Sequence, residues 1–196
     1  MCGRYYVDDQ TAEEVKQPVC RVSQNLQPGI STGDVRPAEP AWVLLRTRSK
    51  WQLVRMKWGY PGREGSGLVI NARSETVLEK PMFADSIRER RCVIPISGFY
   101  EWNSRKEKYK CFHREQRVMY LAGCFKAFEG ENRFVILTTK ANPSMAGIHE
   151  RMPLVLPDDA LTAWTEDCSQ LTGLLAGEPE PLLTGTDYEQ MILDLF

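Results

Sequence analysis

The first residue that suggests chemistry is Cys2, which directly follows the initiator methionine in the segment MCGR (1–4). An aminopeptidase that removes Met1 before a small side chain would leave Cys2 with both a free thiol and a free α-amine. An internal cysteine cannot offer both groups, because its nitrogen is part of a peptide bond. The terminus is therefore a candidate nucleophile of a kind that no other cysteine of the chain can provide.

Three further stretches combine residue types that a plain hydrophobic core would not need. They are INARSET (70–76), GFYEW (98–102) and IHERMP (148–153). Glu101 is the most unusual residue among them, because it lies between two aromatic residues at the end of an apolar run. A carboxylate in such a place either points to solvent or is held in a cleft with a raised pKa. Taken alone, Asn71 also suits a turn and His149 a structural histidine.

Other common catalytic motifs are missing from the sequence. The two histidines, His113 and His149, belong to no HxxxH, HExxH or CxxC arrangement, so we expect no metal site and no cofactor. GxGxxG, Walker A and GxSxG motifs do not occur either. Their absence argues against a nucleotide-phosphate site and against a serine nucleophile elbow.

The elements that must position these residues are expected to be mainly strands. Apolar, β-branched and aromatic runs bounded by Gly, Pro, Asn or charged residues are typical of strands, and they occur at 41–46, 51–58, 91–102, 118–125 and 134–139. Helical patterns occur at 11–17, 74–80, 82–90, 158–166 and 187–194, whereas Pro and Gly predict irregular chain at 33–40. The strands follow no βαβ rhythm. This order predicts an α+β fold with a mainly antiparallel, curved or barrel-like β-sheet and peripheral helices.

Composition sets broader limits. The chain has 196 residues, 42% of them hydrophobic, and neither repeats nor a long linker, so we expect a single domain over 1–196. Six cysteines without a CxxC pair or a regular framework are expected to be reduced and mostly buried. Neither a signal peptide nor a membrane span is evident, which predicts a cytoplasmic protein.

Charge is distributed unevenly along the chain. The formal net charge is −1, but residues 152–196 carry nine acidic side chains and no lysine or arginine. A basic surface can therefore form on the first three quarters of the chain, so the near-neutral balance does not exclude a polyanionic partner. The alternative explanation of the acidic tail is an ordinary solvated face.

Taken together and in this order, the four stretches resemble the SRAP family, the abasic-site processing proteins once described as SOS-response-associated peptidases. The resemblance covers nearly the whole chain through MCGR, WG (58–59), INARSET, KPMF (80–83), RRCVIPISGFYEW (90–102), AGCF (122–125), ILTTKAN (136–142) and IHERMPLVL (148–156). It implies an SRAP fold and a monomer of the DNA damage response that binds single-stranded DNA. Such a protein links covalently to abasic sites and is nucleoid-associated when bound to DNA.

The chemistry of Cys2 agrees with this implication. A ring-opened abasic sugar is an aldehyde, which the amine of Cys2 can condense with to give a Schiff base. The thiol can then close onto the imine carbon to form a five-membered thiazolidine. An unperturbed α-amine titrates near ~8 and a thiol near ~8.5, so a modest fall in the amine pKa leaves much of the amine nucleophilic at neutral pH.

The resemblance also implies roles for the surrounding residues. Glu101 would move protons during ring opening and dehydration, His149 would exchange protons with the amine or the sugar hydroxyl, and Asn71 would hold the terminus or the sugar oxygen. The implied DNA contacts are phosphate-binding arginines, stacking tryptophans and a threonine, namely Arg4, Arg73, Arg151, Trp58, Trp102 and Thr138. Core packing is the alternative role for both tryptophans.

Two other functions are compatible with the same residues. An N-terminal cysteine peptidase or hydrolase would use the Cys2 thiolate with His149 as base, and its activity could be limited to autocatalytic loss of Met1. A single-strand-binding module would use the arginines and tryptophans without chemistry. Residues 25–29 and 60–69 depart from the family pattern, so the sequence does not predict a preference for strand or junction.

Overall fold

The computed structural model describes residues 2–20 and 30–186. Its strands are β1 (Tyr5–Val7), β2 (Gly33–Val35), β3 (Pro40–Thr47), β4 (Lys50–Trp58), β5 (Tyr60–Pro61), β6 (Leu68–Val69), β7 (Asn71–Arg73), β8 (Arg91–Ile96), β9 (Gly98–Trp102), β10 (Lys108–Phe112), β11 (Met119–Phe128), β12 (Glu131–Lys140), β13 (Arg151–Pro153), β14 (Val155–Leu156) and β15 (Leu183–Thr186). The α-helices are α1 (Asp9–Cys20), α2 (Ala84–Glu89), α3 (Leu161–Glu166) and α4 (Leu171–Leu175), and short 3-10 turns occupy Arg63–Gly65 and Asp158–Ala160.

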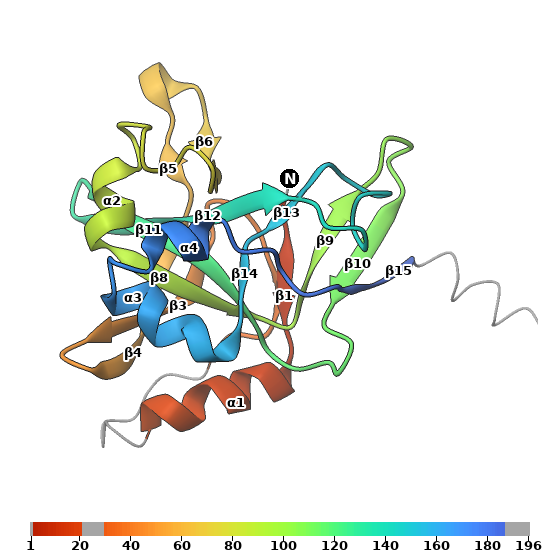
Figure 1. The fold of residues 1–196 in the computed structure, drawn as a ribbon, viewed down its shortest axis with the longest axis horizontal. Helices are drawn as coiled ribbons and strands as arrows, with labels where there is room; N and C mark the ends of the chain where they lie inside the picture. The colour runs from red at the N-terminus through yellow and green to blue at the C-terminus, as the bar shows by residue number, and fades with distance from the viewer. Residues whose placement is uncertain (1, 21–29, 187–196) are drawn as a thin grey trace, which may run out of the picture.

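Five of the long strands close into a barrel, around which the helices lie (Figure 1). β12 pairs with β4, β4 with β3, β3 with β8, β8 with β11, and β11 pairs back with β12. Only the β4–β12 pairing in this ring is parallel. Closure leaves no free edge between these strands, which protects an apolar interior. The expected α+β fold with a mainly antiparallel, barrel-like sheet is therefore confirmed.

A second sheet lies beside the barrel in the strand order β15-β10-β9-β1-β2. The chain passes from the barrel to this sheet at Ser97, between β8 and β9. The Ser97 hydroxyl accepts a hydrogen bond from the Asp8 backbone N–H (2.8 Å) and donates one to the Thr11 hydroxyl (2.7 Å). Because Asp8 also caps the start of α1 by accepting from the Thr11 N–H (2.8 Å), the crossing is tied to that helix. The single strand expected at 91–102 is thus two strands in two sheets.

An aromatic cluster joins the two sheets. The ring of Trp58 is fully buried, lies 5.2 Å from the Tyr5 ring and stacks on Phe134 at 6.3 Å with an interplanar angle of 9°. Its indole N–H donates to the Ile70 carbonyl at 3.0 Å, so its polar group is satisfied in the core. This packing holds β1 against the barrel, and with it the residues that precede β1.

Most of the expected helices and strands occur, with shifted bounds. The helix expected at 11–17 is the longer α1, and the one expected at 82–90 is the shorter α2. The pattern at 158–166 divides into a 3-10 turn and α3, whereas 33–40, expected to be irregular, contains β2. The helix expected at 187–194 lies outside the described residues, so the single domain over 1–196 stays a prediction.

The helix expected at 74–80 is wrong. These residues form consecutive turns, with the Glu79 N–H bonded to the Thr76 carbonyl at 3.1 Å. Pro81 limits any helix here at its C-terminal end, because a proline disfavours the helical conformation in the residue before it, Lys80. α4 was not expected at all.

No helix among residues 2–20 and 30–186 is long and apolar enough to cross a membrane.

Candidate active site

Cys2 is held at the end of the barrel by a residue far along the chain. Its side chain is buried, with 1% of its surface exposed. The Asn71 side-chain amide donates to the Cys2 carbonyl at 2.9 Å, across 69 positions of sequence. Asn71 begins β7, which pairs in parallel with β12 so that Asn71 lies opposite Ile136. The first residues of the chain are therefore fixed to the barrel wall through one side chain.

Asn71 also presents an unused acceptor. Its Oδ1 atom is buried and has no hydrogen-bond partner among the described residues. A buried acceptor without a donor is costly in a folded protein. An incoming hydroxyl or ammonium group would satisfy it.

Glu101 reaches the site from the second sheet. It lies on β9, which pairs with β1, and the neighbouring Tyr100 N–H donates to the Arg4 carbonyl at 2.9 Å. Burial alternates along β9, so that Phe99 and Glu101 are buried and Trp102 is exposed. Only 2% of Glu101 is exposed. The glutamate thus faces inward, toward the ends of the chain segments that carry Cys2 and His149.

His149 completes the group. Its Nδ1 atom lies 3.6 Å from Glu101 Oε1, and 26% of its side chain is exposed. Nδ1 accepts a hydrogen bond from the Arg151 N–H at 2.9 Å. Because Nδ1 is an acceptor there, a neutral His149 carries its proton on Nε2. A neutral His149 therefore has its donor at Nε2, while its Nδ1 lies near both Glu101 and the Arg151 N–H.

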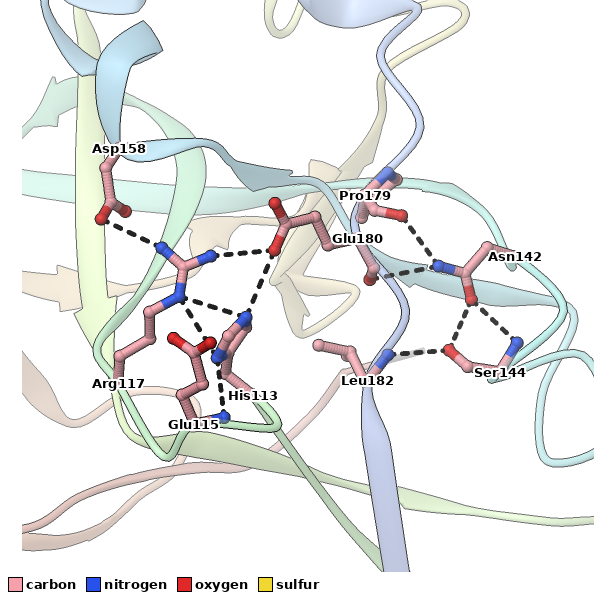
Figure 2. A network of polar contacts seen from close by, with 9 residues as sticks. All are labelled: His113, Glu115, Arg117, Asn142, Ser144, Asp158, Pro179, Glu180 and Leu182. Carbon is pink, nitrogen blue, oxygen red and sulfur yellow. Dashed lines mark hydrogen bonds and ion pairs between the residues drawn. The ribbon is translucent and has the colours of Figure 1, made fainter.

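The turn that carries His149 is itself anchored (Figure 2). The Asn142 amide donates to the carbonyls of Pro179 (2.9 Å) and Glu180 (3.2 Å), and its oxygen accepts from the Ser144 hydroxyl (2.6 Å) and N–H (3.1 Å). The Ser144 hydroxyl in turn accepts from the Leu182 N–H at 3.0 Å. These bonds tie the beginning of the turn to the segment before β15.

The Cys2 thiol is kept in its protonated form. Burial raises the pKa of this thiol, and the negative charge of Glu101 raises it further. Its sulfur lies 3.9 Å from the Arg4 carbonyl, a weak contact to a hydrogen-bond acceptor. A protonated thiol is a poor nucleophile until a base removes its proton. Glu101 is therefore the carboxylate whose negative charge disfavours the thiolate form of Cys2.

The arginines expected at the DNA differ in their surroundings. Arg151 forms a two-bond ion pair with Glu75 (2.7 and 2.8 Å) and donates to the Thr138 carbonyl at 2.5 Å. The hydrogen bond from Arg151 lowers the pKa of the Glu75 carboxyl. Arg73 is exposed on β7. Arg4 lies 3.5 Å from Asp34, so both Arg4 and Arg151 have carboxylate partners.

Two expected DNA contacts are contradicted by burial. Trp58 and Thr138 have no exposed surface. A base cannot stack on an indole that packs on both sides in the core, and a fully buried hydroxyl cannot reach a phosphate. Trp58 instead packs between the sheets, and Thr138 accepts a hydrogen bond from Arg151 at 3.3 Å through its hydroxyl. Trp102, by contrast, is 37% exposed.

Two residues of this region were missed by sequence reasoning. Glu75, the partner of Arg151, lies within INARSET, and Asn142, the anchor of the His149 turn, lies within ILTTKAN. Both residues lie in motifs that carry the family resemblance, but the sequence does not show what their side chains touch. Within residues 2–20 and 30–186, no group of three His, Cys, Asp or Glu side chains is placed to hold a metal ion.

The fold and the site together define a class of protein. The sequence model of the family described as SOS response associated peptidase (SRAP) matches residues 1–184. The chain therefore belongs to the SRAP family.

Relatives of the chain come from distant organisms. The "Abasic site processing protein YoqW" of Bacillus subtilis is 31% identical over 180 residues, which cover 84% of this chain and 80% of the relative. The "Abasic site processing protein YedK" of Escherichia coli is 26% identical over 191 residues, covering 91% of this chain and 84% of YedK. A crystal structure of a Bordetella bronchiseptica protein has the same fold, with a TM-score of 0.77 at 18% identity over 94% of this chain and 99% of that one.

Proposed function

We propose that this protein, once Met1 is removed, binds single-stranded DNA and links covalently to abasic sites through Cys2. The observation that carries the proposal is the meeting of a buried Cys2, a buried Glu101 and His149 at one place, with Asn71 holding the Cys2 carbonyl. The names of the relatives, which describe abasic site processing, support the same substrate.

Burial of the Cys2 thiol favours an order in which the amine reacts first. The α-amine attacks the aldehyde carbon of the opened sugar first, because an amine needs only a small fall in pKa to be neutral. Glu101 or His149 donates a proton to the resulting hydroxyl, water leaves, and an imine remains. The thiol then adds to the imine carbon while its proton moves, through Glu101, to the imine nitrogen. One water molecule is released overall, and the product is a thiazolidine.

The same thiol chemistry weighs against the peptidase alternative. A cysteine hydrolase needs a thiolate as its first nucleophile. Burial and the charge of Glu101 both oppose thiolate formation at Cys2. In the proposed reaction the thiol acts second, on an imine already in contact with it, so the raised pKa is less costly.

The unused Oδ1 of Asn71 has a place in this reaction. Opening of the sugar ring creates a hydroxyl group, which is a hydrogen-bond donor. A buried acceptor next to Cys2 can orient that hydroxyl and hold the sugar in its open form. Arg73, which is exposed on β7 two residues after Asn71, is the arginine best placed to meet a flanking phosphate, whereas Arg4 and Arg151 would first have to give up their carboxylate partners.

The test is a search for an adduct that survives denaturation. Protein shown by mass measurement to lack Met1 is incubated with a single-stranded oligonucleotide that contains one abasic site, and the mixture is run on a denaturing gel. We expect a one-to-one adduct for the wild type. Cys2→Ala retains an α-amine, so its adduct should appear only after borohydride reduction of the imine.

Cys111→Ala is the matched control. Cys111 is also buried, and burial and the charge of Glu101 raise its pKa to about 12, but its nitrogen lies within the chain. We expect this variant to link to DNA like the wild type. Absence of any adduct from the processed wild-type protein would falsify the proposal.

A further inference from the structure

The ion pair between Glu75 and Arg151 lies at the rim of the candidate active site. The Arg151 N–H donates to His149 Nδ1 at 2.9 Å. Glu75 follows β7 by two residues, and β7 begins with Asn71, whose amide holds the Cys2 carbonyl. The ion pair therefore connects the segment that positions His149 with the segment that positions Cys2.

The carboxylate of Glu75 binds the end of the Arg151 guanidinium through two parallel hydrogen bonds. Nη1 donates to Oε1 at 2.7 Å, and Nη2 donates to Oε2 at 2.8 Å. A phosphate group accepts from a guanidinium through the same two-bond geometry. Glu75 therefore occupies the position that a phosphate of DNA would take on this arginine.

The rest of the Arg151 side chain is enclosed by protein. Nη2 also donates to the Thr138 carbonyl at 2.5 Å, and Nε is buried without a hydrogen-bond partner among the described residues. Only 12% of the Arg151 side chain is exposed, compared with 46% of the Glu75 side chain. The accessible part of the ion pair is thus mainly the carboxylate. A phosphate can form two bonds with the end of the guanidinium only if it displaces Glu75.

Two exposed cations lie on the same face of the sheet as this ion pair. On β12, Thr138 lies opposite Arg73 and Lys140 lies opposite Arg151. Residues opposite each other in neighbouring strands share a face, as do residues two positions apart in one strand. The hydrogen bond from Arg151 lowers the pKa of the Glu75 carboxyl, and the charge of Arg73 contributes to this shift. A phosphate that replaced Glu75 would therefore meet further positive charge.

We propose that Glu75 determines how strongly the site binds single-stranded DNA: it occupies the phosphate position on Arg151 in the free protein, and a backbone phosphate must displace it. The inference rests on the proposed function, because it takes DNA as the occupant of the site. Every strand that binds then loses the free energy of the ion pair. A covalent link to Cys2 compensates this loss only for a strand with an abasic site, so Glu75 favours release of undamaged strands.

The first experiment measures noncovalent binding of undamaged oligothymidylate of about 16 nucleotides by fluorescence anisotropy near 0.1 M salt. Without an aldehyde no adduct forms, so the result does not depend on the proposed chemistry. Glu75→Gln retains the size of the side chain but removes the charge that competes with phosphate. We expect its affinity to rise about fivefold, the upper end of what an exposed ion pair contributes. Loss of a merely structural ion pair would leave the affinity unchanged or lower it.

Glu131→Gln is the matched control. The Glu131 side chain is 45% exposed and also pairs with two cations, Lys57 at 3.1 Å and Arg133 at 2.8 Å. It begins β12, whereas Arg151 lies opposite the last residue of that strand. Roughly 30 Å of strand separates the two ion pairs, well beyond the Debye length of about 10 Å at 0.1 M salt. We expect this variant to stay within about 1.5-fold of the wild type. Equal gains from the two variants would overturn the proposal.

A double-mutant cycle tests whether the gain comes from release of Arg151. Arg151→Gln, checked for folding by circular dichroism, should bind oligothymidylate more weakly than the wild type. Adding Glu75→Gln to it should change the affinity by less than about twofold, because there is no guanidinium left to release. Arg151→Lys, which cannot form the two parallel bonds, takes its place if the first variant does not fold, and it should also reduce the gain. A gain that persists undiminished would show general repulsion between Glu75 and DNA and would contradict the proposal.

The role of Glu75 and the covalent chemistry fail separately. If the wild type forms no adduct with abasic DNA, the expected difference in oligothymidylate affinity still stands. If Glu75→Gln and the wild type bind oligothymidylate equally, the role of Glu75 is overturned even though an adduct forms.

Discussion

The two histidines of the chain each lie beside a glutamate, but in opposite surroundings. His149 Nδ1 is 3.6 Å from Glu101, whose side chain is 3% exposed. His113 Nε2 is 3.2 Å from Glu180, whose side chain is 62% exposed. Figure 2 shows that Glu180 also receives a hydrogen bond from Arg117, at 2.8 Å.

The difference teaches that the neighbours, and not the residue types, decide what such a pair can do. In the exposed pair, water screens the charges and Arg117 compensates the carboxylate, so a proton transfer there has little consequence. In the buried pair, the carboxylate is shielded from water and lies near enough to Cys2 to raise the pKa of its thiol. A change of protonation at Glu101 therefore acts directly on the candidate nucleophile.

The largest contrast is expected between Glu101→Gln and Glu180→Gln. Loss of a general acid or base typically costs about 10²-fold to 10⁴-fold in rate. We expect the first variant to slow adduct formation by about 10²-fold, whereas the second should stay within about twofold. Single-turnover linking to an abasic oligonucleotide measures both. Similar rates for the two variants would show that the buried pair has no special role.

A smaller effect is expected where the two regions are joined. Asn142 anchors the turn that carries His149 to the segment containing Glu180 (Figure 2). Asn142→Ala would remove the partner of the buried Pro179 carbonyl and three further, partly buried hydrogen bonds, so we expect a loss of about 1–3 kcal/mol of unfolding free energy in urea denaturation. The linking rate should fall as well. Ser144→Ala, which removes only two of these hydrogen bonds, is the milder comparison; an equal or larger loss from it would argue against Asn142 as the anchor.

The smallest effect concerns the ion pair between Glu75 and Arg151, which is intermediate in exposure, with side chains 46% and 12% exposed. The pKa of Glu75 is lower in the folded protein than its ordinary value of 4.5. On acidification the unfolded chain therefore takes up the proton first. The contribution of Glu75 to stability is present above about pH 5 and is lost as the pH falls through the folded pKa.

Urea denaturation from pH 7 to pH 3 checks this sign. The wild type should be more stable than Glu75→Gln by less than about 1 kcal/mol at pH 7, as for partly exposed ion pairs. The difference should shrink as the pH falls below about 4.5. A difference that grows on acidification would show that the ion pair is not its source.

The strands of the barrel were largely predictable, because their patterns are local. The apolar runs at 41–46, 51–58 and 134–139 lie within β3, β4 and β12. Short strands escaped prediction. β1 and β7 have three residues each, too few for a pattern, and they exist because longer strands already in place pair with them. The break at Ser97 also depends on a distant contact, with Asp8 and Thr11.

The site was predictable as a set of residue types but not as an arrangement. Nothing local indicates that the Asn71 amide binds the Cys2 carbonyl, or that Thr138 lies beneath Arg151. The two tryptophans show the limit most clearly. Trp58 and Trp102 are the last residues of β4 and β9, but one packs between two sheets and the other is exposed. What distinguishes the two residues is their packing: Trp58 is covered by Tyr5 and Phe134, which come from distant strands, and Trp102 stays exposed.

The position of β1 has a mechanical consequence. It lies inside the second sheet, with Tyr5 paired to Val35 of β2 on one side and to Phe99 of β9 on the other. In the proposed adduct, a DNA strand under tension would pull on Cys2, three residues before β1. The part of that force directed along β1 would be shared by hydrogen bonds on both sides of the strand, rather than peeling an edge strand away one bond at a time. The end of the chain is thus built to bear load.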